Sequence, residues 1–555
     1  MKKLSIILTL LLLMGGKAFA QYEFEYVFDS IKNETPCSLF YDIIELDNGD
    51  FVLHGLDLTK YYSPCLYEFS PTGELIKEKL FRNDFELPGY NRLHNNGGSP
   101  FFSDKNGGYY LFLTYNPIFD TTNINFIPDT YDAKIIMNKL DENFDVEYSK
   151  EMKICLDTVD WNILWQPGSS PPYIEIGTAF EDDGEGFIIS YEKYIGANPS
   201  HLWNHGKDST FFLKTDYDLN IIKKGFFEHE RCNNLNHRNH FLYDRENDIY
   251  LYYTSIMHIG FYVRQFDSEF NLIKENVMKG TTGTGNHAIA LRDEVYNCQG
   301  ITLKRTSSNT TLVGSSAFIA HFSKKIYFAG LCFEINDNAK LIDSMEFARD
   351  NGYTSSNKTA VPSCCSIDYF EDNKIFFGAT PHAWFSHGHF PEFQYFVLRS
   401  LDRNLNTTSE MYYDMGVDST ALWINTLKAT RDGGCIIAGH FRNYVENPHD
   451  NHPIAFHSVV KKFPPEAFNG IEEAHDNGLK VAFAYPNPGN NVLNIRTALP
   501  DSHVEVYDAN GKLVFNQDIT DIVTSIDVEK WSSGIYVWKV VSDGKEAETG
   551  KWVRE

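Results

Sequence analysis

A short motif that recurs seven times along the chain limits what this sequence can fold into. Each copy is an Asn-, Asp- or Gly-rich turn followed by a short apolar run, such as DNGDFVLHG. The copies lie at 47–55, 104–114, 181–191, 245–254, 322–330, 370–379 and 430–440. Asn, Asp and Gly tolerate the positive φ that a two-residue hairpin turn needs. The nearly continuous apolar runs are typical of strands covered on both faces.

A second pattern follows most copies of the motif and consists of an apolar strand, a polar turn and another strand. It lies at 67–81, 137–152, 213–227, 264–277, 333–347 and 398–413. Each unit is therefore predicted to be two hairpins, with strands a, b, c and d. Regular short strands with turn signals indicate an all-β protein, and repeated four-stranded units favour a β-propeller. Seven copies predict seven blades, and six or eight blades are the alternatives.

The repeat region lacks a strand at its C-terminal end and has an additional strand at its N-terminal end. The last unit ends after 456–463 at Pro464 and Pro465, which cannot donate to a strand ladder, so no d strand follows. At the other end, YEFEYVF (22–28) precedes the first unit. We expect 22–28 to complete the last blade, since closure of the ring removes an exposed edge. A local N-terminal hairpin is the alternative, and the predicted propeller region spans 21–463.

The first twenty residues have the pattern of a secretory signal peptide. Lys2 and Lys3 precede an apolar core over 4–14, and Ala18-Phe19-Ala20 matches the small-residue cleavage pattern. We expect cleavage to leave a mature chain that begins at Gln21 and has no transmembrane segment, because the apolar core is too short to span a bilayer. The 49 basic and 75 acidic residues give a net charge of −26, which disfavours a nucleic-acid partner.

The composition changes after residue 463. The acidic, breaker-rich stretch 464–480 is predicted to be a linker. After it come short alternating strands with turns at Asn510-Gly511 and Asp543-Gly544, which predict a small β-sandwich over 481–555.

This C-terminal module resembles the C-terminal sorting domain of type IX (Por) secretion. The residues that match its motifs are Pro486, Asn487, Pro488, Tyr507, Asp508, Gly511, Lys512, Gly534, Tyr536 and Lys551. The resemblance implies that the type IX machinery is a partner, and that the protein crosses the periplasm and the outer membrane. It further implies removal of the domain during maturation, followed by release or attachment to the cell surface. The sequence DGGCIIAG at 432–439 also resembles repeats of secreted bacterial propellers.

Aromatic residues gather in the long loops that are predicted to share one face of the ring. The a–b and c–d turns are short, whereas the b–c and d–a connections are long and carry the residues most suited to binding. The candidate ligand-binding residues are Trp161, Trp165, Trp203, Trp384 and Tyr444. Flat aromatic rings beside Asp and Asn suit stacking on sugars or an interface with a cell-surface protein. The alternative is that these rings pin the loops to the propeller rim.

Histidines gather in two of these loops and form the one candidate metal site. They are His387, His389, His449 and His452. Imidazoles with a carboxylate such as Asp450 suit a divalent metal, Zn²⁺ or Cu²⁺. Solvated histidines without a metal are the alternative, and no other cofactor is identified.

Searches for catalytic motifs find no nucleophile elbow and no His-Glu-x-x-His sequence. A glycosidase needs two placed carboxylates, and 75 acidic residues make any pair uninformative. We therefore predict a secreted or surface-attached propeller that binds a glycan or a protein rather than an enzyme. The alternative is a secreted hydrolase that acts on carbohydrate.

Overall fold

The computed structural model describes the strands and short turns of the chain. The described residues are 23–28, 38–57, 63–81, 85, 87, 90–92, 100–117, 132–156, 173–182, 184–194, 207–230, 241–256, 260–278, 289–291, 294–306, 309–320, 326–347, 366–370, 374–380, 395–413, 420–443, 455–468, 482–485, 489–497, 502–520, 523–542 and 545–554. Within these ranges, no helix has the length and apolar character needed to cross a membrane.

Seven sheets of four or five antiparallel strands precede the C-terminal module in the described residues. We number them blade 1 to blade 7 in chain order. Blade 1 contains β2 (Ser38–Glu45), β3 (Phe51–Asp57), β4 (Ser63–Phe69) and β5 (Leu75–Leu80). Blade 2 contains β6 (Tyr90–Arg92), β7 (Phe101–Ser103), β8 (Tyr109–Pro117), β9 (Asp132–Leu140) and β10 (Val146–Cys155). Blade 3 contains β11 (Tyr173–Glu181), β12 (Phe187–Tyr194), β13 (Lys207–Thr215) and β14 (Ile221–Glu230).

The remaining blades follow the same order along the chain. Blade 4 contains β15 (Phe241–Asp244), β16 (Ile249–Ile256), β17 (Gly260–Phe266) and β18 (Leu272–Met278). Blade 5 contains β19 (Ile289–Leu291), β20 (Glu294–Arg305), β21 (Thr310–Ala320), β22 (Ile326–Asn336) and β23 (Leu341–Phe347). Blade 6 contains β24 (Ile367–Phe370), β25 (Lys374–Ala379), β26 (Phe396–Leu401) and β27 (Thr407–Tyr413). Blade 7 contains β28 (Thr420–Ala429), β29 (Cys435–Asn443), β30 (Ala455–Phe463) and β1 (Phe24–Phe28).

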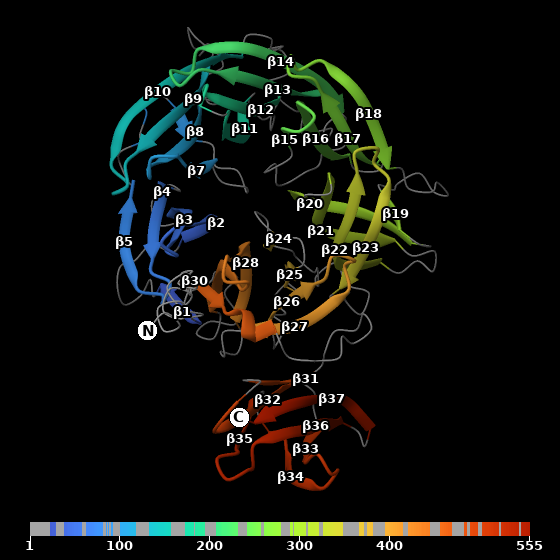
Figure 1. The fold of residues 1–555 in the computed structure, drawn as a ribbon. Helices are drawn as coiled ribbons and strands as arrows, with labels where there is room; N and C mark the ends of the chain where they lie inside the picture. Colours follow the sequence, from blue (N-terminus) through green and yellow to red (C-terminus); the bar gives the residue numbers. More distant parts are fainter. Residues whose placement is uncertain are drawn as a thin grey trace, which may run out of the picture.

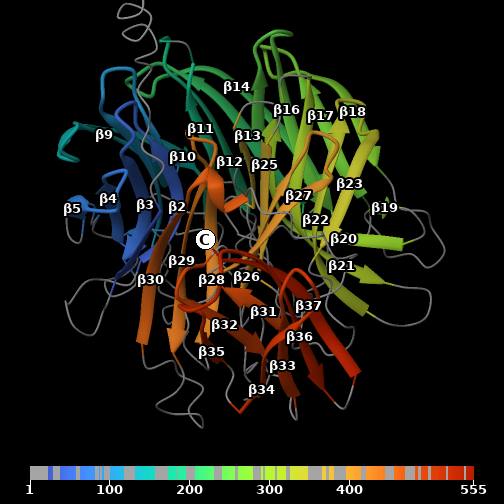
Figure 2. The same ribbon diagram turned by 60° about the horizontal axis from the view of Figure 1, so that its bottom comes forward.

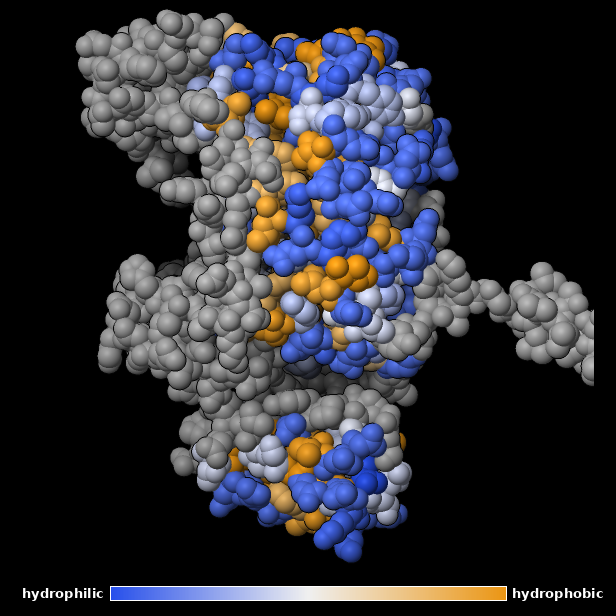
Figure 3. All heavy atoms as spheres, turned by 90° about the vertical axis from the view of Figure 1, so that its left-hand side faces the viewer, coloured by the Kyte–Doolittle hydropathy of each residue, from blue (hydrophilic) through white to orange (hydrophobic). Residues whose placement is uncertain are grey.

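The blades stand around a common centre, with β2, β11, β15, β24 and β28 innermost (Figure 1). β3 and β4 are buried along their whole length because adjacent blades cover both of their faces. The outermost strands, such as β5, alternate between half-buried and exposed residues. On the side of β5 and β10, apolar residues lie scattered among hydrophilic ones (Figure 3). The prediction of a β-propeller is confirmed, and the blade count of the whole chain stays a prediction.

β1 pairs antiparallel with β30, with Phe24 opposite Lys462 and Phe28 opposite Ser458. This is the pairing that was expected to close the ring. Phe24 and Phe28 pack between blades 7 and 1, in a cluster that includes Phe40 and Tyr67 of blade 1. The N-terminal strand therefore joins the two ends of the propeller region.

The turns between the a and b strands are longer than the two-residue turns that we expected. After β2, the Gly49 N–H donates to the Leu46 carbonyl at 2.8 Å, and Gly49 takes a φ of 93°. The Leu46 N–H then donates to the Asp50 carbonyl at 2.8 Å. The positive φ thus belongs to the fourth residue of the turn.

The turns between the c and d strands repeat a feature that the sequence motif did not reveal. In blade 3, the Asp216 carboxylate accepts the N–H groups of Asp218 and Asn220 at 2.9 and 2.8 Å. The fourth turn residue, Leu219, takes a φ of 62° and is buried. Buried apolar residues with positive φ occupy the same place in other blades; they are Phe144, Phe270, Ala339 and Leu405.

Blade 1 has Gly73 at this turn position, and its missing side chain is replaced from another strand. Gly73 takes a φ of 84°, and a Cβ added there would lie 2.4 Å from Cγ of Phe24. The Phe24 ring also stacks on Phe69 at a centroid distance of 6.3 Å. β1 therefore supplies the side chain that other blades supply from their own turn.

Two further sheets follow the propeller, beyond a 3₁₀ turn, η2 (Pro465–Phe468), whose Phe468 packs on Phe376 at 4.8 Å between ring centroids. One sheet contains β31 (Ala482–Tyr485), β32 (Val492–Thr497) and β35 (Val523–Asp527). The other contains β33 (Ser502–Tyr507), β34 (Leu513–Asp518), β36 (Gly534–Ser542) and β37 (Lys545–Arg554). Figure 2 brings this pair of sheets forward. Their shared core makes them a small β-sandwich, as predicted, whereas the exact domain boundaries stay predictions.

Candidate functional site

The aromatic and histidine residues predicted to bind a ligand or a metal lie outside the described residues. They are Trp161, Trp165, Trp203, Trp384, Tyr444, His387, His389, His449 and His452. Glycan stacking and divalent-metal binding at these positions therefore stay predictions. Among the residues that the structure does describe, no group of three His, Cys, Asp or Glu side chains is placed to hold a metal ion.

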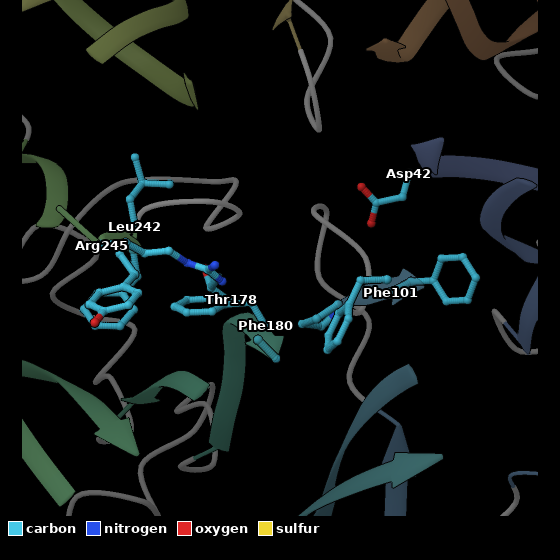
Figure 4. A pocket seen from close by; sticks show the side chains of 12 residues that line it. Asp42, Phe101, Thr178, Phe180, Leu242 and Arg245 are labelled. Atoms are coloured by element: carbon cyan, nitrogen blue, oxygen red, sulfur yellow. The ribbon is translucent and has the colours of Figure 1, made fainter. Parts of the chain in front are cut away.

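A cavity of about 470 Å³ lies among the innermost strands of blades 1 to 4. Its wall comes from β2, β7, β11 and β15 and from residues that adjoin them. Figure 4 shows Asp42 on one side and Arg245 on the other, with Phe101, Phe180 and Leu242 among the apolar lining. The volume falls within the usual range for a small-molecule site.

β-Bulges place two of the polar side chains on this wall. In β2 the register against β3 shifts between Phe40 and Asp42, and in β11 the register against β12 shifts between Ile176 and Thr178. Asp42 and Thr178 each follow the extra residue directly. A bulge adds one residue to a strand and changes the direction of the side chains after it, and bulges are frequent beside functional sites.

The aromatic side chains of the cavity are held by rings behind them. Phe241 stacks on Phe212 at a centroid distance of 4.5 Å and on Tyr250 at 5.2 Å. The ring centroid of Phe180 lies 6.5 Å from that of Phe241. This packing fixes the apolar wall in place, so a ligand would meet a preformed surface rather than order a loose one.

The Thr178 hydroxyl is a buried polar group of the cavity. The Thr178 N–H donates to Oγ of Ser190 at 3.1 Å. Oγ1 of Thr178 has no hydrogen-bond partner within the described residues. A buried hydroxyl without a partner is costly, and a ligand atom or an ordered water in the cavity would satisfy it.

The innermost strands of blades 5, 6 and 7 are joined by charges instead. The buried Asp368 of β24 lies 3.1 Å from Nζ of Lys304 and 3.3 Å from Nζ of Lys428, and it accepts the Ala429 N–H at 3.0 Å. Burial by itself would raise the pKa of Asp368, but the two lysines outweigh burial and hold its pKa below the ordinary value. Asp368 therefore remains ionised and ties three blades together.

Sequence reasoning missed Asp42, Thr178 and Arg245. Asp42 and Thr178 both stand three residues before the end of their strands, and this shared position was the signal available. The turn motif and the long loops give no information about residues inside the a strands.

In the C-terminal sandwich, several residues of the predicted sorting motif shape the fold. The Asp508 carboxylate accepts the N–H groups of Asn510 and Lys512, both at 2.9 Å, and Gly511 takes a φ of 79°. Tyr536 is buried, and its hydroxyl donates to the Ser532 carbonyl at 2.8 Å. These residues therefore set a turn and the core.

Other motif residues lie at or near the surface. Tyr507 is half-buried, Lys551 is exposed, and Gly534 begins β36 with open space where a Cβ would stand. Pro486, Asn487 and Pro488 lie outside the described residues. The next residue, Gly489, donates its N–H to the Val553 carbonyl at 2.9 Å, which ties the end of that motif to the last strand.

Comparison with solved structures gives several distant likenesses. PorZ of the type IX secretion system of Porphyromonas gingivalis is 11% identical, with 93% of this chain and 81% of that chain covered and a TM-score of 0.17. The WD40 domain of SCAP from fission yeast is 8% identical, with coverages of 77% and 97% and a TM-score of 0.29. An endo-arabinase from Bacteroides thetaiotaomicron is 8% identical, with coverages of 69% and 95% and a TM-score of 0.26.

None of the curated proteins compared with this chain matches it. Residues 483–555 match the family model of the secretion system C-terminal sorting domain. The observed sandwich covers the same residues, and its turn and core use the motif residues described above. The chain is therefore a β-propeller protein with a C-terminal sorting domain, exported by type IX secretion to the cell surface or the extracellular space.

Proposed function

We propose that the exported propeller binds a glycan in the cavity that the innermost strands of blades 1 to 4 line. The observation that carries this proposal is the composition of the cavity wall, where fixed aromatic rings stand between a carboxylate and a guanidinium. Aromatic faces stack on the apolar faces of sugar rings, while Asp42 and Arg245 suit hydroxyl and carboxyl groups at their edges. A concave, solvent-open surface of this size suits a sugar better than a protein surface.

Hydrolysis of carbohydrate is the second candidate function, and the described lining favours binding over it. A glycosidase needs two carboxyl groups on opposite sides of the scissile bond. Asp42 is the one carboxylate among the described residues that line the cavity. The predicted loop aromatics, Trp203 and Trp384 among them, would extend the binding surface within this proposal.

The test is a screen of the purified full-length protein against an array of neutral and acidic oligosaccharides. We expect a defined set of glycans to bind, and Arg245→Ala to weaken that binding about tenfold, as for the loss of one charge-assisted hydrogen bond. Lys105→Ala is the matched control because it removes the same charge from an exposed turn outside the cavity. Equal binding by both variants would place the site elsewhere, and new reducing ends from a bound glycan would favour the hydrolase.

A further inference from the structure

One face of the sorting domain carries more apolar surface than its fold requires. In the sheet β34-β33-β36-β37, alternate residues point into the sandwich core, among them Val504, Val506, Trp538 and Trp552. The residues between them point outward. The register places Tyr507 opposite Val537 and Val537 opposite Lys551, and it places Ile535 opposite Val553.

The outward residues at this end of the sheet are apolar and accessible. Ile535 is 52% exposed, Leu513 is 44% exposed and Val553 is 36% exposed. Leu513 pairs with Tyr507, which extends the apolar residues to the β34 edge. In a sandwich, apolar residues that point inward normally alternate along each strand with polar residues that point outward. This cluster of outward apolar residues departs from that alternation. We call Leu513, Tyr507, Val537, Ile535 and Val553, with Lys551 at their margin, the apolar face.

The described outward residues of β32 and β35, in the other sheet, follow the normal pattern. In β32 and β35, Asn494 lies opposite Ser525, whose hydroxyl donates to Oδ1 of Asn494 at 2.8 Å. Val492 is the exposed large apolar residue there, at 40%, and it lies opposite Asp527. The described outward residues of β32 and β35 thus differ in chemistry from the apolar face.

The apolar face also contains two residues of the predicted sorting motif: Tyr507, whose hydroxyl donates to Glu505 at 2.6 Å, and the exposed Lys551. Asp508 and Gly511 set a turn, and Tyr536 enters the core, so packing accounts for them. Core packing does not account for Ile535, which stands exposed between Gly534 and the buried Tyr536. Exposed apolar patches that a fold does not need mark interaction sites.

We propose that the apolar face is the surface by which the type IX export machinery takes up this protein. The occupant is a machinery component, because the sorting domain is the part of the chain that marks it for export. Its contact surface would be apolar where it covers Ile535 and Val553, with an acidic group opposite Lys551. Apolar anchors at the centre of such an interface supply most of the binding energy.

The experiment follows export of the full-length chain in a host that carries a type IX system. Immunoblots of the periplasmic and the extracellular plus surface fractions measure the exported share. We expect Ile535→Asp and Val553→Asp each to lower that share about tenfold, as for loss of an interface anchor. Val492→Asp is the matched control, since it places the same charge on a similarly exposed residue of the other sheet, and it should be exported normally.

A second pair of variants separates recognition from folding. Ile535→Thr keeps a β-branched residue at an exposed strand position, so it should fold and yet lower export. Lys551→Glu should lower export while Lys551→Arg preserves it. Thermal unfolding of each purified chain should match that of the parent. Normal export of Ile535→Asp and Ile535→Thr, or equal retention of Val492→Asp, would overturn the proposal. Glycan binding by the purified variants should not change, so this test is independent of the proposed function.

Discussion

The innermost strands of blades 1 to 4 line a cavity, whereas the a strands of blades 5 to 7 are joined to one another by ion pairs. A further ion pair, between Asp244 of β15 and Arg305 of β20 at 2.8 Å, links the two groups of blades. In the first arc, β2, β7, β11 and β15 surround a cavity with aromatic walls. In the second arc, β24 carries a buried carboxylate that pairs with lysines from β20 and β28. We call them the cavity arc and the ion-paired arc.

The a strand of a blade can therefore serve either stability or binding. A buried charge is tolerated where partners surround it, and those partners then fix the neighbouring strands. In the first group of blades, aromatic and other apolar residues instead line a space that a ligand can enter. The predictions below test this division of roles, beginning with the largest expected effect.

Removal of the carboxylate from the ion-paired arc should cause the largest loss of stability. Asp368→Ala leaves Lys304 and Lys428 close together without their anion and leaves the Ala429 N–H without its acceptor. We expect the free energy of unfolding of the propeller to fall by about 3 kcal/mol in urea denaturation. Asp145→Ala is the control, because its pair with Lys79 is exposed and contributes below about 1 kcal/mol. Equal losses for both variants would contradict the comparison.

The same carboxylate should make stability depend on acidic pH. Because the folded-state pKa of Asp368 is lowered from the ordinary value of 3.8, its contribution is fully present above 3.8 and is lost as the pH falls through the folded pKa. The melting temperature should therefore drop more steeply below pH 4 in the parent protein than in Asp368→Asn. Parallel curves for the two proteins would show that Asp368 does not carry this dependence.

In the cavity arc, loss of one aromatic ring should weaken glycan binding. For a glycan selected on the array, Phe180→Ala should raise Kd about fivefold, since one stacked ring contributes about 1 kcal/mol. Phe226→Ala is the control, because this ring is 63% exposed and does not line the cavity. Isothermal titration calorimetry measures both. A Kd unchanged by Phe180→Ala would remove this ring from the site.

The smallest effect on stability is expected at Thr178. Thr178→Val keeps the side-chain shape and removes a buried hydroxyl that has no partner within the described residues. The free energy of unfolding should change by less than about 0.5 kcal/mol, or rise slightly. Glycan binding, measured in parallel, should fall if the ligand satisfies this hydroxyl. A loss of stability as large as that of Asp368→Ala would mean that the hydroxyl supports the fold.

The sequence predicted the features that depend on local pattern. The Asn- and Gly-rich turns between apolar runs predicted the paired strands, as β2 and β3 show. The unpartnered strand at 22–28 and the prolines at 464–465 predicted the pairing of β1 with β30, because an unpaired sheet edge is unfavourable. The motifs of 481–555 predicted the sorting domain, which the family model confirms.

Features that depend on contacts between distant residues could not be predicted in this way. The sequence does not show that Leu219 takes a positive φ, since its burial against another blade outweighs the preference of leucine for negative φ. The bulges that place Asp42 and Thr178 on the cavity wall depend on the register with the neighbouring strand. The cavity itself arises from four strands that lie far apart in sequence.

The Phe24 ring fills the space beside Gly73, so complete packing of blade 1 requires the N-terminal strand of the propeller region. The hollow above Gly73 is filled by a residue from the start of the propeller region, and that residue is held in place by β30 at its end. A chain shortened at either end of this region would leave the hollow open and the apolar rings around it, such as Phe69, uncovered. Proteases act on such exposed segments, so a chain that lacks β1 should be degraded more readily than the full-length chain.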